Sequence, residues 1–151
     1  MVNAALEDWL VLDAAAPSIE EPLLTFLDGT ARGELVLPFC TNGHPLDFDQ
    51  GRCEQDGSTE QPVWRTVSSR ATVIASIVMH RTEKTFVKAV VPYPVIEVEL
   101  GSGHRLYVST DREPERNYQA GDQVELTFVV VGETRIPRIQ VEEPKNKRSG
   151  Q

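Results

Sequence analysis

The sequence of 151 residues contains only two cysteines, Cys40 and Cys53. Two cysteines are too few for the disulfide framework that stabilises small secreted domains. No run of about 18 apolar residues occurs, so no membrane-spanning helix is expected. The N-terminal residues also lack the basic region that opens a secretory signal. Together these features predict a cytoplasmic protein without a membrane segment.

Common catalytic motifs are also missing from the sequence. It has no Gly-x-Ser-x-Gly elbow, no phosphate-binding loop and no His-Glu-x-x-His motif. Among the three histidines, His80 is the best candidate for a general base, because it ends a predicted strand beside Arg81. A general base needs a positioned partner, and no base is evident for Cys40 or Cys53 as nucleophiles. The sequence therefore predicts no catalytic residue.

Negative charge is concentrated in the first part of the chain. The net charge is −8. Residues 1–60 contain 12 acidic residues and 2 arginines, whereas residues 61–151 contain 11 acidic and 13 basic residues. An acidic surface repels phosphate backbones, which argues against nucleic-acid binding. A small phosphate-bearing ligand could still meet local basic residues in the second part.

Two short helices are predicted at the N-terminus. Residues 4–12 are rich in helix formers and place Leu6, Trp9 and Leu10 on one face. Ser18 and Glu21 have capping-box spacing at the start of a second helix. In this helix Pro22 lies in the first turn, Gly29 is the expected stop, and Leu23, Leu24, Phe26 and Leu27 form an apolar stripe.

The apolar residues of this N-terminal arm have two interpretations. They pack into the core of this chain, or they form a surface that a partner buries. Trp9 and Phe26 are the candidates for partner contact.

From residue 63 onward the sequence alternates with the period of β-strands. The predicted strands are 71–80, 95–100, 105–110, 123–131 and 134–141. The residues expected to share a face are Val73, Ala75, Ile77 and Met79 in the first strand, Ile96, Val98 and Leu100 in the second, and Val124, Leu126, Phe128 and Val130 in the fourth. Five antiparallel strands without a strong helix predict a mainly β fold built on a small barrel.

Between the arm and the barrel, a short strand at 34–38 precedes a polar segment. Residues 40–62 are rich in Gly, Asp, Gln and Asn and can bury little apolar surface. They therefore need a cross-link or contacts with another part of the protein to be stable.

The order of these signals resembles the DUF35-type proteins, which join a zinc ribbon to an OB-fold. Residues 33–37 are similar to that family's Gly-x-Leu-x-Leu strand, and Cys40 occupies its first ligand position. Residues 53–58 resemble its second knuckle, with Asp56 in place of a cysteine. The matching barrel segments are 78–81, 92–93, Gly101, 121–124 and 136–138.

The resemblance covers residues 22–141. Together with the apolar N-terminal segments and the polar, basic residues 142–151, it predicts a division of the chain into four parts. These are a helical arm at 1–32, a degenerate zinc ribbon at 33–62, a five-stranded OB-fold barrel at 63–141 and a disordered tail at 142–151.

The two knuckles depart from the family at the metal ligands. Gly43 stands where the family has its second cysteine, and His44 follows one position later. Structural zinc sites use four Cys or His ligands. The sequence therefore predicts no cofactor and a metal-free ribbon in which the two cysteines are small buried hydrophobic residues. Zinc held by Cys40, His44, Cys53 and Asp56 and a Cys40–Cys53 disulfide are the alternatives.

The resemblance implies a non-catalytic accessory subunit of a thiolase-like enzyme that acts on acyl-CoA, by acyl transfer or by retro-aldol cleavage as in steroid side-chain degradation. The candidate contacts to ligand or partner, besides those in the arm, are Arg81, Lys84, Phe86, Lys88 and Tyr93. A stand-alone acyl-CoA-binding module is an alternative. An OB-fold nucleic-acid binder is another, although that function needs aromatic platforms in a basic groove.

Overall fold

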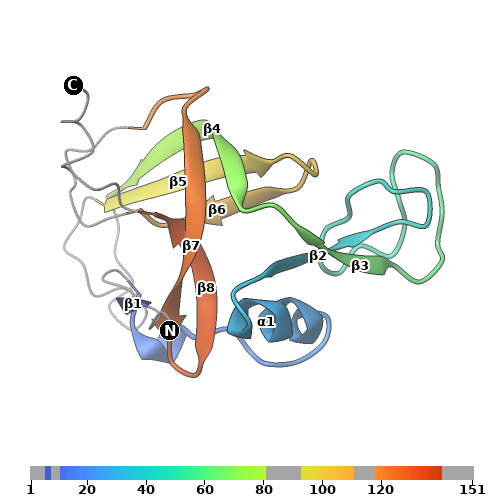
Figure 1. The fold of residues 1–151 in the computed structure, drawn as a ribbon, viewed down its shortest axis with the longest axis horizontal. Coiled ribbons are helices and arrows are strands. Elements are labelled where there is room, and N and C mark those ends of the chain that lie inside the picture. Colours follow the sequence, from blue (N-terminus) through green and yellow to red (C-terminus); the bar gives the residue numbers. More distant parts are fainter. Residues whose placement is uncertain (1–5, 8–10, 81–92, 111–117, 141–151) are drawn as a thin grey trace.

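The computed structural model describes residues 6–7, 11–80, 93–110 and 118–140. Its largest part is a barrel of five strands (Figure 1). The strands are β4 (Arg70–Met79), β5 (Tyr93–Leu100), β6 (Arg105–Val108), β7 (Gln123–Val131) and β8 (Thr134–Ile139). Their order is β8-β7-β4-β5-β6, and all paired neighbours are antiparallel.

The barrel closes between β6 and β8. A parallel bridge joins Ser109 to Arg138, and the Ile139 N–H donates to the Ser109 carbonyl at 3.1 Å. Five strands closed in this way form the Greek-key barrel of an OB-fold. The predicted five-stranded OB-fold barrel is therefore confirmed.

A two-stranded ribbon projects from the barrel. Strands β2 (Leu35–Phe39) and β3 (Val63–Val67) are antiparallel, and the polar segment 40–62 lies between them. Figure 1 shows these loops at the right, well away from most of the barrel. Strand β2 is buried at every position. It therefore ties the ribbon to the rest of the molecule.

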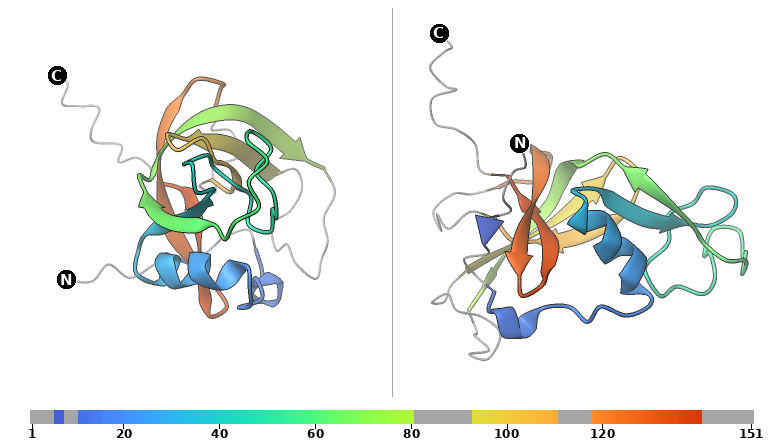
Figure 2. Two further views of the ribbon diagram at one scale, coloured as in Figure 1. Left: turned by 90° about the vertical axis from the view of Figure 1, so that its right-hand side faces the viewer. Right: turned by 60° about the horizontal axis from the view of Figure 1, so that its bottom comes forward.

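Helix α1 (Leu23–Ala31) packs across the base of the barrel, against β2 and β8 (Figure 2). Its Phe26 and Leu27 are buried in the same apolar cluster as the barrel residues Val73, Ile96 and Val98. The hydrophobic core is thus shared between the helix, the ribbon strand and the barrel. No helix in the described ranges is long and apolar enough to cross a membrane.

The first predicted helix is wrong where the structure describes it. Leu6–Glu7 forms a short strand, β1, parallel to β7, and Asp13–Ala15 forms a 3-10 turn, η1. Along β7, pairing with β4 runs only from Gln123 to Glu125, opposite Thr72 and Arg70. Beyond that point β1 satisfies backbone groups of β7 that need partners, and this long-range demand overrides the local helix propensity.

The second predicted helix exists, but its two ends differ from the prediction. It begins at Leu23, whose N–H donates to the Glu20 carbonyl at 2.7 Å, and no side chain caps it. It continues past Gly29 and ends in a Schellman motif. There the Glu34 N–H donates to the Gly29 carbonyl and the Gly33 N–H, at φ +80°, donates to Thr30, both at 2.9 Å.

Strand β5 buries Ile96, Val98 and Leu100 as predicted. The alternation expected for β4 is broken by a bulge between Val73 and Ala75. Beyond the bulge, Ile77 and Met79 are more than one third exposed.

Strand β7 also departs from its predicted face, because Val129 and Val131 on its other face are buried while Phe128 is half-buried. Its two faces are therefore both covered.

Candidate functional site

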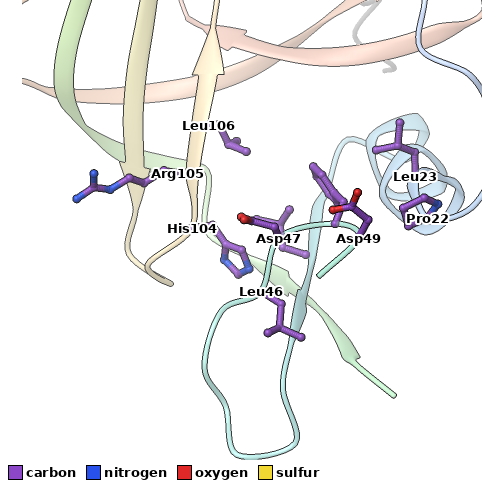
Figure 3. Close-up of a pocket in the computed structure, with 10 residues that line it drawn as sticks. Pro22, Leu23, Leu46, Asp47, Asp49, His104, Arg105 and Leu106 are labelled. Carbon is purple, nitrogen blue, oxygen red and sulfur yellow. The ribbon is translucent and has the colours of Figure 1, made fainter. Parts of the chain in front are cut away.

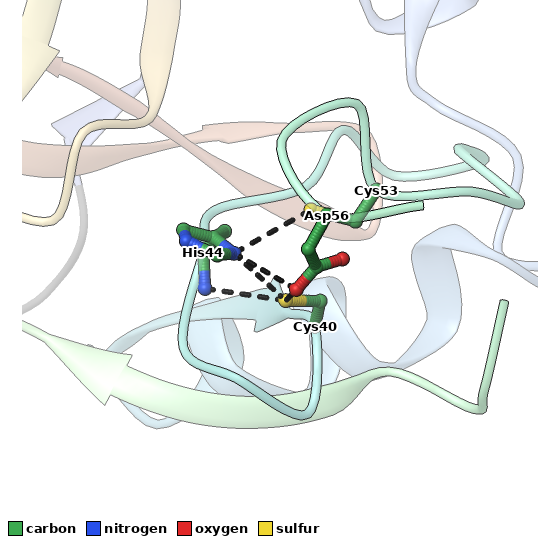
Figure 4. Close-up of side chains that lie close together, drawn as sticks. All are labelled: Cys40, His44, Cys53 and Asp56. Atoms are coloured by element: carbon green, nitrogen blue, oxygen red, sulfur yellow. Dashed lines mark hydrogen bonds and ion pairs between the residues drawn. The ribbon is translucent and has the colours of Figure 1, made fainter. Parts of the chain in front are cut away.

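The two knuckle loops of the ribbon bring four metal-ligating side chains together. Cys40 and His44 come from the turn after β2, and Cys53 and Asp56 come from the second loop (Figure 4). One ligand atom of each residue lies within 4.8 Å of the corresponding atoms of the other three. The four weak metal candidates from the sequence therefore form one cluster.

The distances in this cluster converge on the His44 ring. His44 Nδ1 lies 3.3 Å from Cys40 Sγ, 3.6 Å from Cys53 Sγ and 3.2 Å from Asp56 Oδ2. Neutral imidazole Nδ1 carries one proton or one lone pair, so it cannot make three hydrogen bonds. A cation shared by the four groups satisfies the same arrangement.

The spacing fits a tetrahedral zinc ion. With Zn–S near 2.3 Å and Zn–N and Zn–O near 2.0–2.1 Å, neighbouring ligand atoms should lie about 3.3–3.8 Å apart. The distances from His44, and the 3.5 Å between Cys40 Sγ and Asp56 Oδ2, lie in or next to this range. The residues present therefore fit zinc.

Neighbouring groups orient the ligand atoms. The N–H groups of Asn42 and His44 point to Cys40 Sγ at 3.3 and 3.4 Å. The Asn42 side chain donates to Asp56 Oδ2 at 2.7 Å, and the Ser58 N–H donates to Oδ1 at 2.8 Å. These two donors hold the pKa of Asp56 well below its usual range. The carboxylate is thus fixed in its ionised form, which is the form that binds metals.

The pKa values of the other three ligands are shifted by burial and by hydrogen bonds within the cluster. Burial raises the pKa of the Cys40 thiol, but the N–H groups of His44 and Asn42 together with the His44 and Cys53 side chains lower it overall. The hydrogen bond to Cys40 raises the pKa of His44. Burial raises the pKa of Cys53. Of the two thiols, Cys40 therefore loses its proton more readily than Cys53.

The irregular spacing of the ligands led the sequence analysis to favour a metal-free ribbon. In the structure the extra residue before His44 is accommodated by a tight turn, in which Gly43 has φ +92° and donates its N–H to the Cys40 carbonyl. The histidine then reaches the cluster through Nδ1. Both cysteines are buried, as predicted, and neither forms a disulfide.

His104, which the sequence analysis did not select, joins the ribbon to the barrel. Its Nε2 lies 2.8 Å from the Pro38 carbonyl, its Nδ1 lies 2.7 Å from Ser102 Oγ, and its ring packs edge-on against Phe39. Because a carbonyl can only accept, Nε2 carries the proton and Nδ1 accepts from the serine hydroxyl. Pro38 is 66 positions away, so no local pattern could have revealed this contact.

The stability of the fold should therefore fall as the pH drops below about 6.5. Burial lowers the pKa of His104 in the folded state. At a pH between the pKa of His104 in the folded state and its pKa in the unfolded state, the unfolded chain binds more protons than the folded chain. The contribution of His104 to stability is therefore complete above the unfolded pKa and is lost as the pH falls toward the folded pKa. Urea unfolding at several pH values should show this loss in the wild type. His104→Gln should show a smaller slope, and equal slopes would contradict the assignment.

A pocket of about 410 Å³ lies where α1, the ribbon and the barrel meet (Figure 3). Leu23, Leu37, Leu46 and Leu106 supply apolar lining, and Asp47 and Asp49 line it from the loop after the first knuckle. Helix, ribbon and barrel must all be in place to form it.

Two of the predicted partner or ligand contacts can be located. Phe26 lies in the core, with its ring centroid 4.9 Å from that of Phe48, and Tyr93 is buried at the start of β5. His80 is exposed at the end of β4. The candidates outside the described residues are Trp9, Arg81, Lys84, Phe86 and Lys88. A role in binding stays a prediction for all seven contacts.

Fold and cluster together define an OB-fold protein that carries a small ribbon with a candidate metal centre. A family model described as the C-terminal OB-fold domain of ChsH2 matches residues 64–129. This part of the chain, 64–129, is similar to the OB-fold domain of ChsH2, and the resemblance to DUF35-type OB-fold proteins is confirmed.

A solved structure supports the same fold. A chain of an "Ltp2-ChsH2(DUF35) aldolase" aligns with a TM-score of 0.64 and 22% identity, over 82% of this chain and 97% of that chain. At this identity the likeness establishes a shared fold. No curated protein matches the chain.

Proposed function

We propose that the chain is a non-catalytic subunit that binds a thiolase-like enzyme acting on acyl-CoA substrates. The observation that carries the proposal is the match of residues 64–129 to the OB-fold domain of ChsH2. The structural neighbour is an aldolase that combines Ltp2 with a ChsH2(DUF35) chain. In the proposed complex the enzyme supplies the catalytic residues, and this chain stabilises the enzyme or shapes its acyl or CoA channel.

The roles of two described histidines, His44 and His104, support a non-catalytic assignment. His44 is committed to the ribbon cluster, and His104 is committed to the contact between ribbon and barrel. General acid–base catalysis by a histidine requires access to substrate and a positioned partner. His44 Nδ1 and both ring nitrogens of His104 make contacts within the chain, whereas His80 is exposed at the end of β4.

The ribbon cluster holds a structural zinc ion in this proposal, with Cys40, His44, Cys53 and Asp56 as its four ligands. Four protein ligands leave no open position for substrate, which is the arrangement of structural rather than catalytic zinc. The ion would fix the two loops and through them the position of β2.

Co-expression with a thiolase-like enzyme encoded in the same genome tests the proposed function. With a tag on the enzyme alone, the two chains should purify together and elute as one species in size exclusion. Acyl-CoA cleavage or transfer should appear in the complex and be lower by at least about tenfold in either chain alone, a factor worth about 1.4 kcal/mol.

Two results would contradict the proposal. One is turnover of an acyl-CoA by the isolated chain. The other is full activity of every candidate enzyme without the chain, combined with failure to copurify.

A further inference from the structure

We propose that the pocket between α1, the ribbon and the barrel is a docking site for a basic side chain of the partner enzyme, flanked by apolar residues. The inference rests on the proposed function and adds the chemistry of the interface. Pockets of about 300–1,000 Å³ with mostly apolar walls and a few polar groups are typical binding sites. At about 410 Å³, this pocket is of that size.

Two carboxylates give the pocket its charge. Asp47 and Asp49 both line it and are both exposed. No side chain in the described ranges makes a hydrogen bond or an ion pair with either carboxylate. The hydrogen bonds of Asp47 are made by its backbone, whose N–H donates to Gln50 Oε1 at 2.9 Å and whose carbonyl accepts from the Gln50 N–H at 3.2 Å. Among the described residues, the pocket therefore offers two negative charges that no side chain neutralises.

The nearest cationic groups do not supply the missing charge. Arg105 lines the pocket, but its guanidinium lies 3.3 Å from Glu99 and 3.8 Å from Glu97, and in Figure 3 its side chain points away from the aspartates. His104 has a lowered pKa and donates to Pro38, so it is neutral near pH 7. No cationic side chain of the described residues therefore fills this role, and in the proposal the partner enzyme supplies it.

The surface around the pocket is larger than a small ligand needs. Glu20 and Glu21 immediately precede Pro22, which lines the pocket. Ile19 is 51% exposed although it is large and apolar, and three residues of chain place it within about 11 Å of Pro22. The surface next to the pocket is therefore also apolar and acidic. Such a surface is complementary to a protein surface that carries basic and apolar groups.

Charge complementarity extends to the whole region. Residues 1–60 contain 12 acidic residues and only 2 arginines. Complementary potentials guide association and set the register of a complex. In the proposal, this acidic part of the chain binds a basic surface of the thiolase-like enzyme.

The test compares binding of the full chain to the copurifying thiolase-like enzyme by calorimetry. The double variant Asp47→Asn/Asp49→Asn should raise the Kd by at least about tenfold, and Asp47→Lys/Asp49→Lys should abolish measurable binding. The matched control is Glu60→Lys/Glu133→Lys, which changes the net charge equally at two exposed positions outside the pocket. It should stay within about threefold of wild type.

Equal weakening by the pocket variant and the control would show a general charge effect and overturn the pocket assignment. Unchanged binding of the pocket variants would also overturn it, while the proposed function would stand.

A second measurement does not depend on the enzyme. The ¹⁵N-labelled chain is titrated with acetyl-Leu-Arg-Phe-amide and, separately, with acetyl-Leu-Glu-Phe-amide. Only the basic peptide should shift the amide signals of Asp47, Asp49 and Leu106, and the shifts should vanish in Asp47→Asn/Asp49→Asn. If no enzyme binds but these shifts occur, the proposed function fails and the pocket assignment holds. If the basic peptide causes no shifts there, the pocket assignment fails.

Discussion

Replacing Cys53 with serine should abolish binding of the zinc ion proposed for the ribbon and unfold the two knuckle loops while the barrel stays folded. The wild type should contain about one zinc ion per chain, and the variant less than about one tenth of that amount. Serine keeps the size of the side chain but does not supply the thiolate that zinc prefers. Small metal domains obtain most of their folding free energy from the metal.

Apart from a bound metal ion, the two knuckle loops have few apolar contacts that would stabilise them. Their own apolar cluster consists only of Cys40, Leu46 and Cys53. The barrel, in contrast, has a core that includes β4, β5, β6, β7 and β8. A loss confined to the loops is therefore expected, rather than global unfolding.

Metal analysis, Co²⁺ absorption and tryptophan fluorescence would follow this change. Trp64 lies on β3 with its ring stacked against Phe48 at 6.4 Å, so its emission reports on the ribbon. The comparison variant is Asp56→Cys, which restores the ligand type of the family and should tighten zinc binding. Absence of zinc from the wild type would exclude the structural metal. So would a Cys53→Ser variant whose melting temperature equals that of the wild type.

The parts of this fold that the sequence predicts well are those with strong local periodicity. The alternation of Ile96, Val98 and Leu100 fixed both the strand and its buried face. The pattern failed where long-range contacts decide the outcome. Leu6 pairs with Val129 across more than a hundred residues, and the bulge after Val73 depends on the twist needed to close a barrel.

The candidate site shows the same division between local and distant contacts. All four cluster residues were identifiable from their types, because Cys, His and Asp are the common metal ligands. Their fit could not be judged from spacing, since it depends on the turn at Gly43 and on the way the second loop folds back over the first. The pocket could not be foreseen either, because residues 22–23, 46–49 and 104–106 meet only in the folded chain.

Gly29→Ala should destabilise the protein by about 2 kcal/mol, although alanine is the better helix former by about 1 kcal/mol. A Cβ at position 29 would lie 2.5 Å from Val36 Cγ2 and 3.2 Å from the Glu34 carbonyl oxygen. Valine is stiff at χ1 and cannot turn away easily, so the helix must move off β2. The melting temperature should fall by about 4–8 °C.

The double variant separates this steric effect from any other role of the glycine. In a Val36→Ala background the obstructing methyl group is absent. Adding Gly29→Ala there should cost less than in the wild type, because the 2.5 Å contact is gone while the contacts to the Cβ of residue 36 at 3.0 Å and to the Glu34 carbonyl oxygen at 3.2 Å remain. Such a reduced cost, measured by chemical denaturation of the four proteins, would show that Gly29 is required for the contact between α1 and Val36 of β2. That contact also positions Pro22 and Leu23 at the pocket, so Gly29→Ala should weaken partner binding as well, and the double variant should restore part of it. Equal destabilisation in both backgrounds would mean that the helix does not rest on Val36.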